Sequence, residues 1–179
     1  MQICPSILEP TIDGLLSQIN KLSFYINYFQ IDIADGVFVP NKTVQIEEII
    51  KNISNFKFQI SNLVFDFHLM VSDFEKDIAK LNKLKKLINI KNIFIHYSAI
   101  SDFGFRISDL SDISIGLTLN PEDKVDDLIN HYNLKQIPLI QIMSVTPGVQ
   151  GNPFLPDTLK KIEQLRLLDY RFKIYLDGA

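Results

Sequence analysis

The chain of 179 residues is 46% hydrophobic, which is enough to bury a core as one globular domain. A net charge of −3, with lysines that cluster only around 80–91, argues against a nucleic-acid surface, and no apolar run approaches the ~20 residues that span a bilayer. The single cysteine, Cys4, excludes an internal disulfide. We therefore expect residues 1–179 to form one cytoplasmic domain that binds neither nucleic acid nor membrane.

Short apolar segments alternate with segments of helical spacing along the whole chain. Regular spacing of leucine and isoleucine predicts helices over 11–22, 74–87, 121–129 and 158–168, with Asn120 as the cap of the third. The strand candidates are rich in Ile, Val, Phe and Leu and lie at 2–8, 28–33, 63–70, 92–96, 113–119, 138–145 and 172–176. Strands that alternate with helices predict a parallel sheet with right-handed crossovers.

Several of these strands end in residues that can carry chemistry. Asp32 lies near the end of the second strand, His68 near the end of the third, and Met143 and Asp177 near the ends of the last two. In a parallel α/β barrel the carboxyl ends of the strands meet at one face, where enzymes of this fold place their catalytic residues. The chain is therefore predicted to be an enzyme on an α/β barrel.

The number of strands indicates a barrel that is not complete. Seven strands are predicted, whereas a TIM (β/α)8 barrel has eight and typically about 250 residues. We expect a C-terminally truncated fragment that lacks the eighth strand and the last helices. The bare edges of the first and seventh strands predict that the isolated chain is unstable or aggregates, and a monomeric sample that melts cooperatively would count against this prediction.

Six motifs, in this order, resemble the ribulose-phosphate 3-epimerase family of TIM barrels. They are CPSIL at 4–8, IDIADGVFVPN at 31–41, DFHLM at 66–70, GLTLNP at 116–121, IMSVTPG at 142–148 and YLDG at 175–178. The resemblance covers the whole chain. It implies metal-dependent epimerisation at carbon 3 of a ketopentose phosphate, from D-ribulose 5-phosphate to D-xylulose 5-phosphate, through an enediolate.

The resemblance also implies roles for individual residues. Asp32 is expected to be the base and a metal ligand, Asp177 the acid on the other face and a ligand, and His68 a third ligand that also contacts substrate. One divalent ion is implied, and His with carboxylates suits Zn, Fe, Co or Mn alike. The remaining residues expected to contact substrate are Ser6, Met70, Met143, Gly148, Gly151 and Gly178.

Strand parity supports this placement, because side chains two apart on a strand share a face. Gln30 therefore lies beside Asp32, and Asp66 beside His68. Polar pairs at the ends of apolar strands are costly to bury without partners, and a shared metal site would satisfy them. We expect Asp66 to orient His68 from behind.

The chain departs from the family pattern at three places. Gln30 replaces the usual His, and an amide oxygen is a weak metal ligand, so we expect weaker metal binding. In the loop TPGVQGNPF at 146–154, Val149 and Gln150 replace Phe and Gly of a mobile lid that contacts substrate phosphate. Ala34 replaces a frequent Met.

Structural alternatives remain open for single residues. Asp177 before Gly178 could simply form a turn. His68 could be a hydrogen-bonded histidine of the core, and Met70 and Met143 could serve only to pack the core. Asp35 is expected to order the loop after the second strand. His96 ends a strand and resembles a family histidine near the site, with a direct role left open.

Two other functions also remain open. One is epimerisation of a related ketohexose phosphate such as allulose 6-phosphate, or another reaction of a related phosphosugar barrel. The sister-group aldolases and decarboxylases carry Asp-x-Lys-x-x-Asp, and no lysine follows Asp32 in that pattern. The other is a degenerate, non-catalytic barrel that binds a phosphosugar or a partner protein. A complete barrel of this kind is expected to form a homo-oligomer.

Overall fold

Seven strands form a single parallel sheet in which each strand pairs with the next along the chain, in the order β1-β2-β3-β4-β5-β6-β7. The computed structural model describes residues 2–53, 62–100, 113–132, 137, 139–168 and 171–178. The strands are β1 (Ser6–Ile7), β2 (Tyr28–Ala34), β3 (Val64–Met70), β4 (Asn89–His96), β5 (Ser114–Leu119), β6 (Leu139–Met143) and β7 (Lys173–Asp177).

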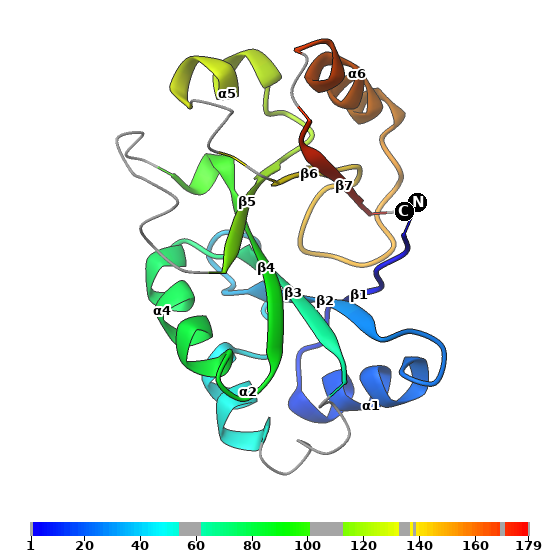
Figure 1. Cartoon of the computed structure of the whole chain (residues 1–179), viewed down its shortest axis with the longest axis vertical. Coiled ribbons are helices and arrows are strands. Elements are labelled where there is room, and N and C mark those ends of the chain that lie inside the picture. Colours follow the sequence, from blue (N-terminus) through cyan, green and yellow to red (C-terminus); the bar gives the residue numbers. More distant parts are fainter. Residues whose placement is uncertain are drawn as a thin grey trace.

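The helices lie along the outside of this curled sheet (Figure 1). Thr11 caps α1 by accepting from the backbone N–H of Gly14, and Asp73 caps α4 by accepting from that of Lys76. The helices are α1 (Ile12–Leu22), α2 (Ile46–Asn52), α4 (Phe74–Leu84), α5 (Val125–His131) and α6 (Lys160–Leu167), with single 3-10 turns η2 (Tyr97–Ala99) and η5 (Pro156–Leu159). Strands alternating with helices in one curled parallel sheet confirm the predicted α/β barrel fold.

Three elements differ from the sequence expectation. Helix α2 was not predicted, because it is short and its cap residue Gln45 makes no side-chain hydrogen bond to mark its start. Helix α5 begins at Val125, not at Pro121, because the backbone N–H of Asn120 donates to Asp123 in a turn that delays the helix. Strand β1 pairs over Ser6–Ile7 alone, while the prediction ran over 2–8.

The curl of the sheet separates an apolar outer face from a polar interior. Outward residues of β2 and β3 such as Phe29, Ile31 and Phe67 belong to the main hydrophobic cluster, packed with residues of α1, α2 and α4. Interior residues meet across the barrel: the Gln30 amide of β2 donates to Asp177 of β7 at 2.6 Å. The curl of the sheet therefore brings polar residues of β2 and β7 together in the barrel interior, while apolar residues cover its outer face.

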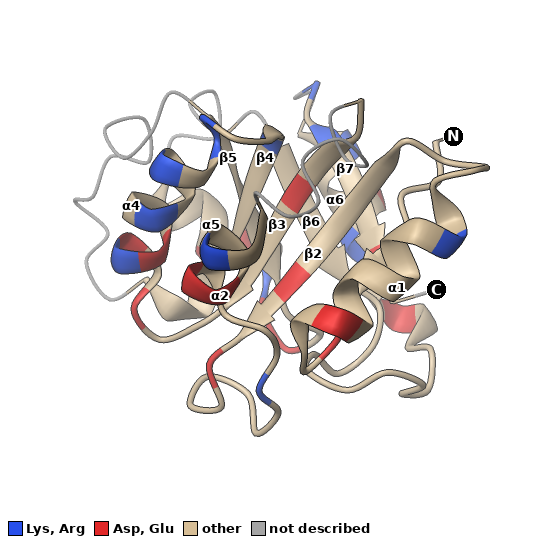
Figure 2. Ribbon diagram, turned by 90° about the horizontal axis from the view of Figure 1, so that it is seen from below, with Lys and Arg blue, Asp and Glu red and all other residues tan. Residues whose placement is uncertain are grey.

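Charges of both signs are mixed over the outer helices (Figure 2), and the sequence holds 18 basic and 21 acidic residues. Among the helices that the structure describes, none has the length and apolar character needed to cross a bilayer.

Candidate active site

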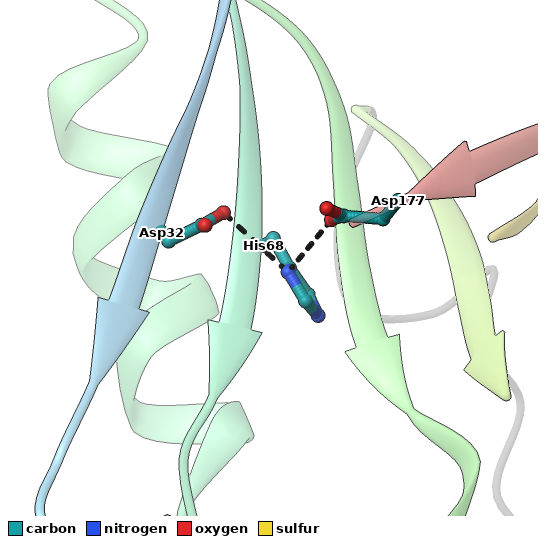
Figure 3. A group of neighbouring side chains, drawn as sticks. All are labelled: Asp32, His68 and Asp177. Carbon is teal, nitrogen blue, oxygen red and sulfur yellow. Dashed lines mark ion pairs between the residues drawn. The ribbon is translucent and has the colours of Figure 1, made fainter. Parts of the chain in front are cut away.

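Two carboxyl groups and one imidazole converge in the barrel interior (Figure 3). Asp32 of β2 lies in register with His68 of β3, and Asp177 ends β7. The Nδ1 atom of His68 lies 3.4 Å from Asp32 Oδ1 and 3.4 Å from Asp177 Oδ2. The three residues predicted from separate strand ends are thus in direct contact around one nitrogen atom.

Neutral donors hold both carboxyl groups in place. The hydroxyl of Ser6 donates to Asp32 Oδ2 in a short hydrogen bond. The Gln30 amide donates to Asp32 Oδ1 at 3.1 Å and to Asp177 Oδ2 at 2.6 Å. A second amide, that of Gln141 on β6, donates to the same oxygen of Asp177 at 2.6 Å. Gln30 therefore bridges the two carboxyl groups, and Asp177 accepts from two amides.

Burial and charge shift the three pKa values differently. Burial raises the pKa of Asp32, and the charge of Asp177 adds to this, while hydrogen bonds from His68 and Ser6 oppose it. Burial also acts to raise the pKa of Asp177, but hydrogen bonds from His68 and Gln30 outweigh it and hold the pKa below its usual value. Burial would lower the pKa of His68, yet the two carboxyl groups raise it to about 9. A positive charge at Nδ1 is thus strongly favoured.

The other nitrogen of His68 faces a second histidine. His68 Nε2 and His96 Nε2 are 2.8 Å apart, and the two rings stack with centroids separated by 4.8 Å. Phe38, from the loop after β2, packs on His96 at a centroid distance of 4.7 Å. Both imidazoles are fully buried.

The donor set fits a divalent metal ion. One nitrogen and two carboxylate oxygens, from Asp32, His68 and Asp177, lie within 4.8 Å of one another. His68 Nδ1 is buried and faces both carboxyl groups at 3.4 Å, with no other partner within the described residues. An imidazole nitrogen with carboxylate oxygens is a ligand set that several divalent transition metals accept. These three residues could therefore hold an ion.

The predicted methionines are both buried near this centre. Met70 ends β3 and packs in a small cluster with Ala34 and Val39. Met143 ends β6 in register with Asp177, and its sulfur lies 3.9 Å from the Gln141 amide nitrogen. Their contact with substrate stays a prediction.

The predicted glycines lie in loops after β6 and β7. Gly148 has φ of +96°, and a Cβ there would come within 2.7 Å of Val39. The loop after β6 thus packs against the loop after β2. Gly178 has φ of +99° beside Val145, and Gly151 has φ of +80° with open space around it. Positive φ at these positions favours glycine.

Asp35 orders two loops, as expected. Its Oδ1 accepts from the backbone N–H groups of Val37 and Phe38, each at 2.8 Å. Its Oδ2 accepts from the N–H and the hydroxyl of Ser72, each at 2.8 Å. The loops after β2 and β3 are thereby tied together beside the site.

The expectation that Asp66 orients His68 is wrong. Asp66 Oδ1 accepts from the Asn92 amide at 2.8 Å, and Oδ2 accepts from the Tyr28 hydroxyl in a short hydrogen bond. Residues two apart on a strand share a face but are separated by about 6.6 Å along the strand. The Asp66 carboxyl group therefore lies nearer the start of β3 than the His68 ring and finds different partners.

Sequence reasoning missed Gln141. It is polar, completely buried, and two residues before Met143 on the same face of β6. The parity argument applied to Gln30 would have found it. Its contact to Asp177 comes from a different strand and needed the tertiary structure.

Comparisons with known proteins agree with this geometry. Residues 2–179 match the model of the ribulose-phosphate 3 epimerase family. A protein named ribulose-phosphate 3-epimerase from Methanocaldococcus jannaschii is 29% identical over 190 residues, covering 100% of this chain and 74% of that protein. Proteins of the same name from Helicobacter pylori and Bacillus subtilis are 29% and 27% identical, covering 96% and 100% of this chain and 75% and 81% of theirs. The chain therefore belongs to the ribulose-phosphate 3 epimerase family, a family of isomerases.

Proposed function

We propose that the protein epimerises carbon 3 of a ketopentose phosphate, interconverting D-ribulose 5-phosphate and D-xylulose 5-phosphate. The observation that carries the proposal is the convergence of Asp32 and Asp177, from β2 and β7, on the Nδ1 atom of His68 at 3.4 Å each. The names of the relatives supply the substrate class.

Inversion of a carbon beside a ketone requires one group that removes its proton and another that returns a proton to the opposite face. Asp32 and Asp177 come from different strands, and their pKa values are shifted in opposite directions, raised and lowered respectively. Such divergence is typical of an acid and base pair. In one direction the raised pKa favours Asp32 as the acid and the lowered pKa favours Asp177 as the base, and in the reverse direction the roles exchange.

We assign Asp32, His68 and Asp177 as the residues that would hold one divalent ion. When bound, such an ion supplies positive charge beside the oxygens on which negative charge develops. Ser6 and Gln30 keep the carboxyl groups oriented through the hydrogen bonds described above. Met70 and Met143 line the apolar side of the same space.

We place the substrate phosphate at the loops after β6 and β7. Gly148, Gly151 and Gly178 all have positive φ, which lets backbone N–H groups approach an anion closely. A Cβ at Gly151 would have no neighbour within 4 Å among the described residues beyond the two adjacent in the chain, so its backbone is open to a ligand. The Gln150 amide reaches back to the carbonyl of Leu8 at 3.4 Å, which sets this loop over the end of β1.

The test is exchange of the carbon-3 proton of ribulose 5-phosphate with solvent, followed by NMR in heavy water with and without Zn²⁺, Mn²⁺ or Co²⁺. Exchange that requires metal and disappears in Asp177→Asn supports the proposal. Allulose 6-phosphate is the parallel substrate that distinguishes a hexulose epimerase. Absence of exchange with both sugars, from a protein shown by circular dichroism to be folded, overturns it.

A second candidate is a non-catalytic phosphosugar-binding barrel, favoured by one observation. The Gln30 amide spans both carboxyl groups, at 3.1 Å from Asp32 and 2.6 Å from Asp177, and provides no imidazole to a metal. Metal content of the purified protein separates the two: about one equivalent of a transition metal supports the enzyme, and none after incubation with excess metal supports the binding protein.

We also propose a cytoplasmic location, from the single cysteine, a single domain over 1–179, and a homo-oligomer for the complete barrel. Analytical ultracentrifugation measures the assembly directly, and a monomer across the micromolar range would contradict it.

A further inference from the structure

The two ring nitrogens of His68 have different partners. Nδ1 faces the carboxyl groups of Asp32 and Asp177, and Nε2 lies 2.8 Å from Nε2 of His96. At that separation one of the two Nε2 atoms carries a hydrogen and the other accepts it. The tautomer of His68 is therefore linked to that of His96.

His96 has its own partner on the far side. Asn120 directly follows β5, in which Thr118 pairs with His96, and its side chain donates to Ser98, so it lies beside the His96 ring and interacts with it. His96 Nδ1 and Asn120 Oδ1 are both buried and lack another hydrogen-bond partner within the described residues. A ring N–H and an amide oxygen are complementary, so Nδ1 of His96 is the atom that carries hydrogen toward Asn120. Nε2 of His96 is then left as an acceptor.

The orientation of the Asn120 amide is fixed independently. Its nitrogen Nδ2 donates to the hydroxyl of Ser98 at 2.9 Å, which leaves Oδ1 to face the histidine. The backbone N–H of Asn120 donates to Asp123 at 2.7 Å, and its carbonyl accepts from the buried ammonium of Lys161 on α6. Asn120 is thus held at its side chain and at both backbone groups.

We infer that Asn120 and His96 act in series as positioning residues that keep hydrogen on Nε2 of His68 and aim its Nδ1 at Asp32 and Asp177. Phe38 also packs on the His96 ring, at a centroid distance of 4.7 Å. Outer residues that fix the tautomer of a metal-binding histidine typically change metal affinity 10- to 100-fold when replaced. The inference rests on the proposed function in assigning Nδ1 of His68 as a metal ligand.

The test uses zinc and ring-nitrogen NMR. The chain contains three histidines, so long-range ¹H–¹⁵N spectra of protein labelled on histidine resolve three ring systems. In the zinc-loaded protein we expect His68 to carry hydrogen on Nε2 with zinc on Nδ1, and His96 to carry hydrogen on Nδ1. Hydrogen on Nε2 of His96, or zinc on Nε2 of His68, overturns the inference without reference to any variant.

Variants add a second readout, zinc affinity measured by competition with a chelator. His96→Phe keeps the ring but removes the acceptor, and we expect zinc to bind at least about 10-fold more weakly. His96→Gln restores an acceptor oxygen and should recover most of that loss. His131→Gln is the matched control, because His131 lies on α5 in contact with Tyr97 and away from the carboxyl groups.

Asn120→Leu covers the case in which His96→Phe does not fold. It removes the acceptor for Nδ1 of His96, so we expect a mixture of His96 tautomers and weaker zinc binding, with Asn120→Asp retaining the wild-type spectrum. Unchanged zinc affinity in folded His96→Phe and Asn120→Leu contradicts the inference. Because zinc affinity and tautomer are read without substrate, loss of carbon-3 exchange in the wild type would overturn the proposed function and leave this result standing.

Discussion

Two buried polar groups lie one above the other inside the barrel, and they differ in how fully their hydrogen bonds are satisfied. The lower polar network comprises Tyr28, Asp66, Asn92 and Tyr175. The Asn92 amide donates to Asp66 at 2.8 Å and lies 3.2 Å and 3.1 Å from the two tyrosine hydroxyls. Lys91 and Lys173 cover the two tyrosine rings at 4.6 and 5.0 Å.

The upper group, the carboxylate centre of Asp32, His68 and Asp177, is surrounded by atoms without partners. Within the described residues, the buried atoms Thr118 Oγ1 and Gln141 Oε1 lack a hydrogen bond, and neither belongs to the lower network. Because an unpaired buried polar atom costs about 1–3 kcal/mol, such a cluster indicates a place built for a ligand. The satisfied layer stabilises the barrel, and the unsatisfied layer is the one to which we assign the proposed chemistry.

The largest expected effect is on chemistry at the upper layer. Asp177→Asn removes one of the two proton-transfer groups, and we expect carbon-3 exchange to fall by about 10³-fold or more. Stability should change little, because a buried carboxyl group that shares space with Asp32 is replaced by a neutral isostere. Exchange kinetics and urea unfolding on one sample check both statements. A variant that unfolds would show that the upper group, like the lower network, is needed for stability.

Metal affinity should respond to the residue that bridges the carboxyl groups. Gln30→His places an imidazole between Asp32 and Asp177, and we expect divalent metal to bind about 10- to 100-fold more tightly. Isothermal titration with Zn²⁺ measures the change, with Gln30→Leu as the matched variant that offers no ligand. Equal affinity of the histidine and leucine variants would show that position 30 does not contact the ion.

A substitution in the lower polar network should change the stability of the fold and leave the rate of carbon-3 exchange unaltered. Asp66→Asn turns one acceptor oxygen into a donor that faces the Tyr28 hydroxyl or the Asn92 amide, leaving a buried mismatch. We expect the free energy of unfolding to fall by about 1–3 kcal/mol, with carbon-3 exchange per folded molecule unchanged. Urea midpoints report the first quantity and NMR the second. A drop in exchange without loss of stability would assign Asp66 to the upper layer after all.

A substitution of Gln141 tests whether this residue of β6 belongs with the upper group around Asp177. Gln141→Leu removes an amide that donates to Asp177 Oδ2 at 2.6 Å. A hydrogen bond to a charged group contributes about 1.5–3 kcal/mol, so we expect exchange to slow by roughly 10-fold or more. The variant also removes the unpaired Oε1, so its thermal midpoint should stay near that of the wild type. Unaltered exchange would make Gln141 a packing residue.

The smallest effect concerns pH and the loops beside the site. Burial alone would raise the pKa of Asp35, but hydrogen bonds from Ser72, Phe38 and Val37 outweigh it and lower the pKa. The lowered value means that Asp35 stabilises the fold above its unfolded pKa of about 3.9 and loses this contribution as pH falls through the folded pKa. Asp35→Asn should therefore cost no more than about 1 kcal/mol at pH 7 and less at pH 2. A constant difference at both pH values would exclude a role of the charge.

The alternation of strands and helices, the barrel class and the strand ends that bear Asp32, His68 and Asp177 could all be predicted from the sequence alone. Hydrophobic periodicity and strand parity are local properties, so they can be read from neighbouring residues. Helix α2 escaped because it is short and lacks a capping side chain.

The contacts between polar residues depend on the tertiary structure and could not be predicted from the sequence. Parity placed Asp66 on the same face as His68, but the layer in which each side chain finds its partners depends on strands far apart in the chain, β2, β4 and β7. The same holds for Gln141 on Asp177 and for His96 on His68, since contacts between residues 36 and 28 positions apart follow from the pairing of β6 with β7 and of β3 with β4. Local pattern predicts the face of a strand on which a residue lies, and the pairing and curl of the sheet decide which side chains it meets.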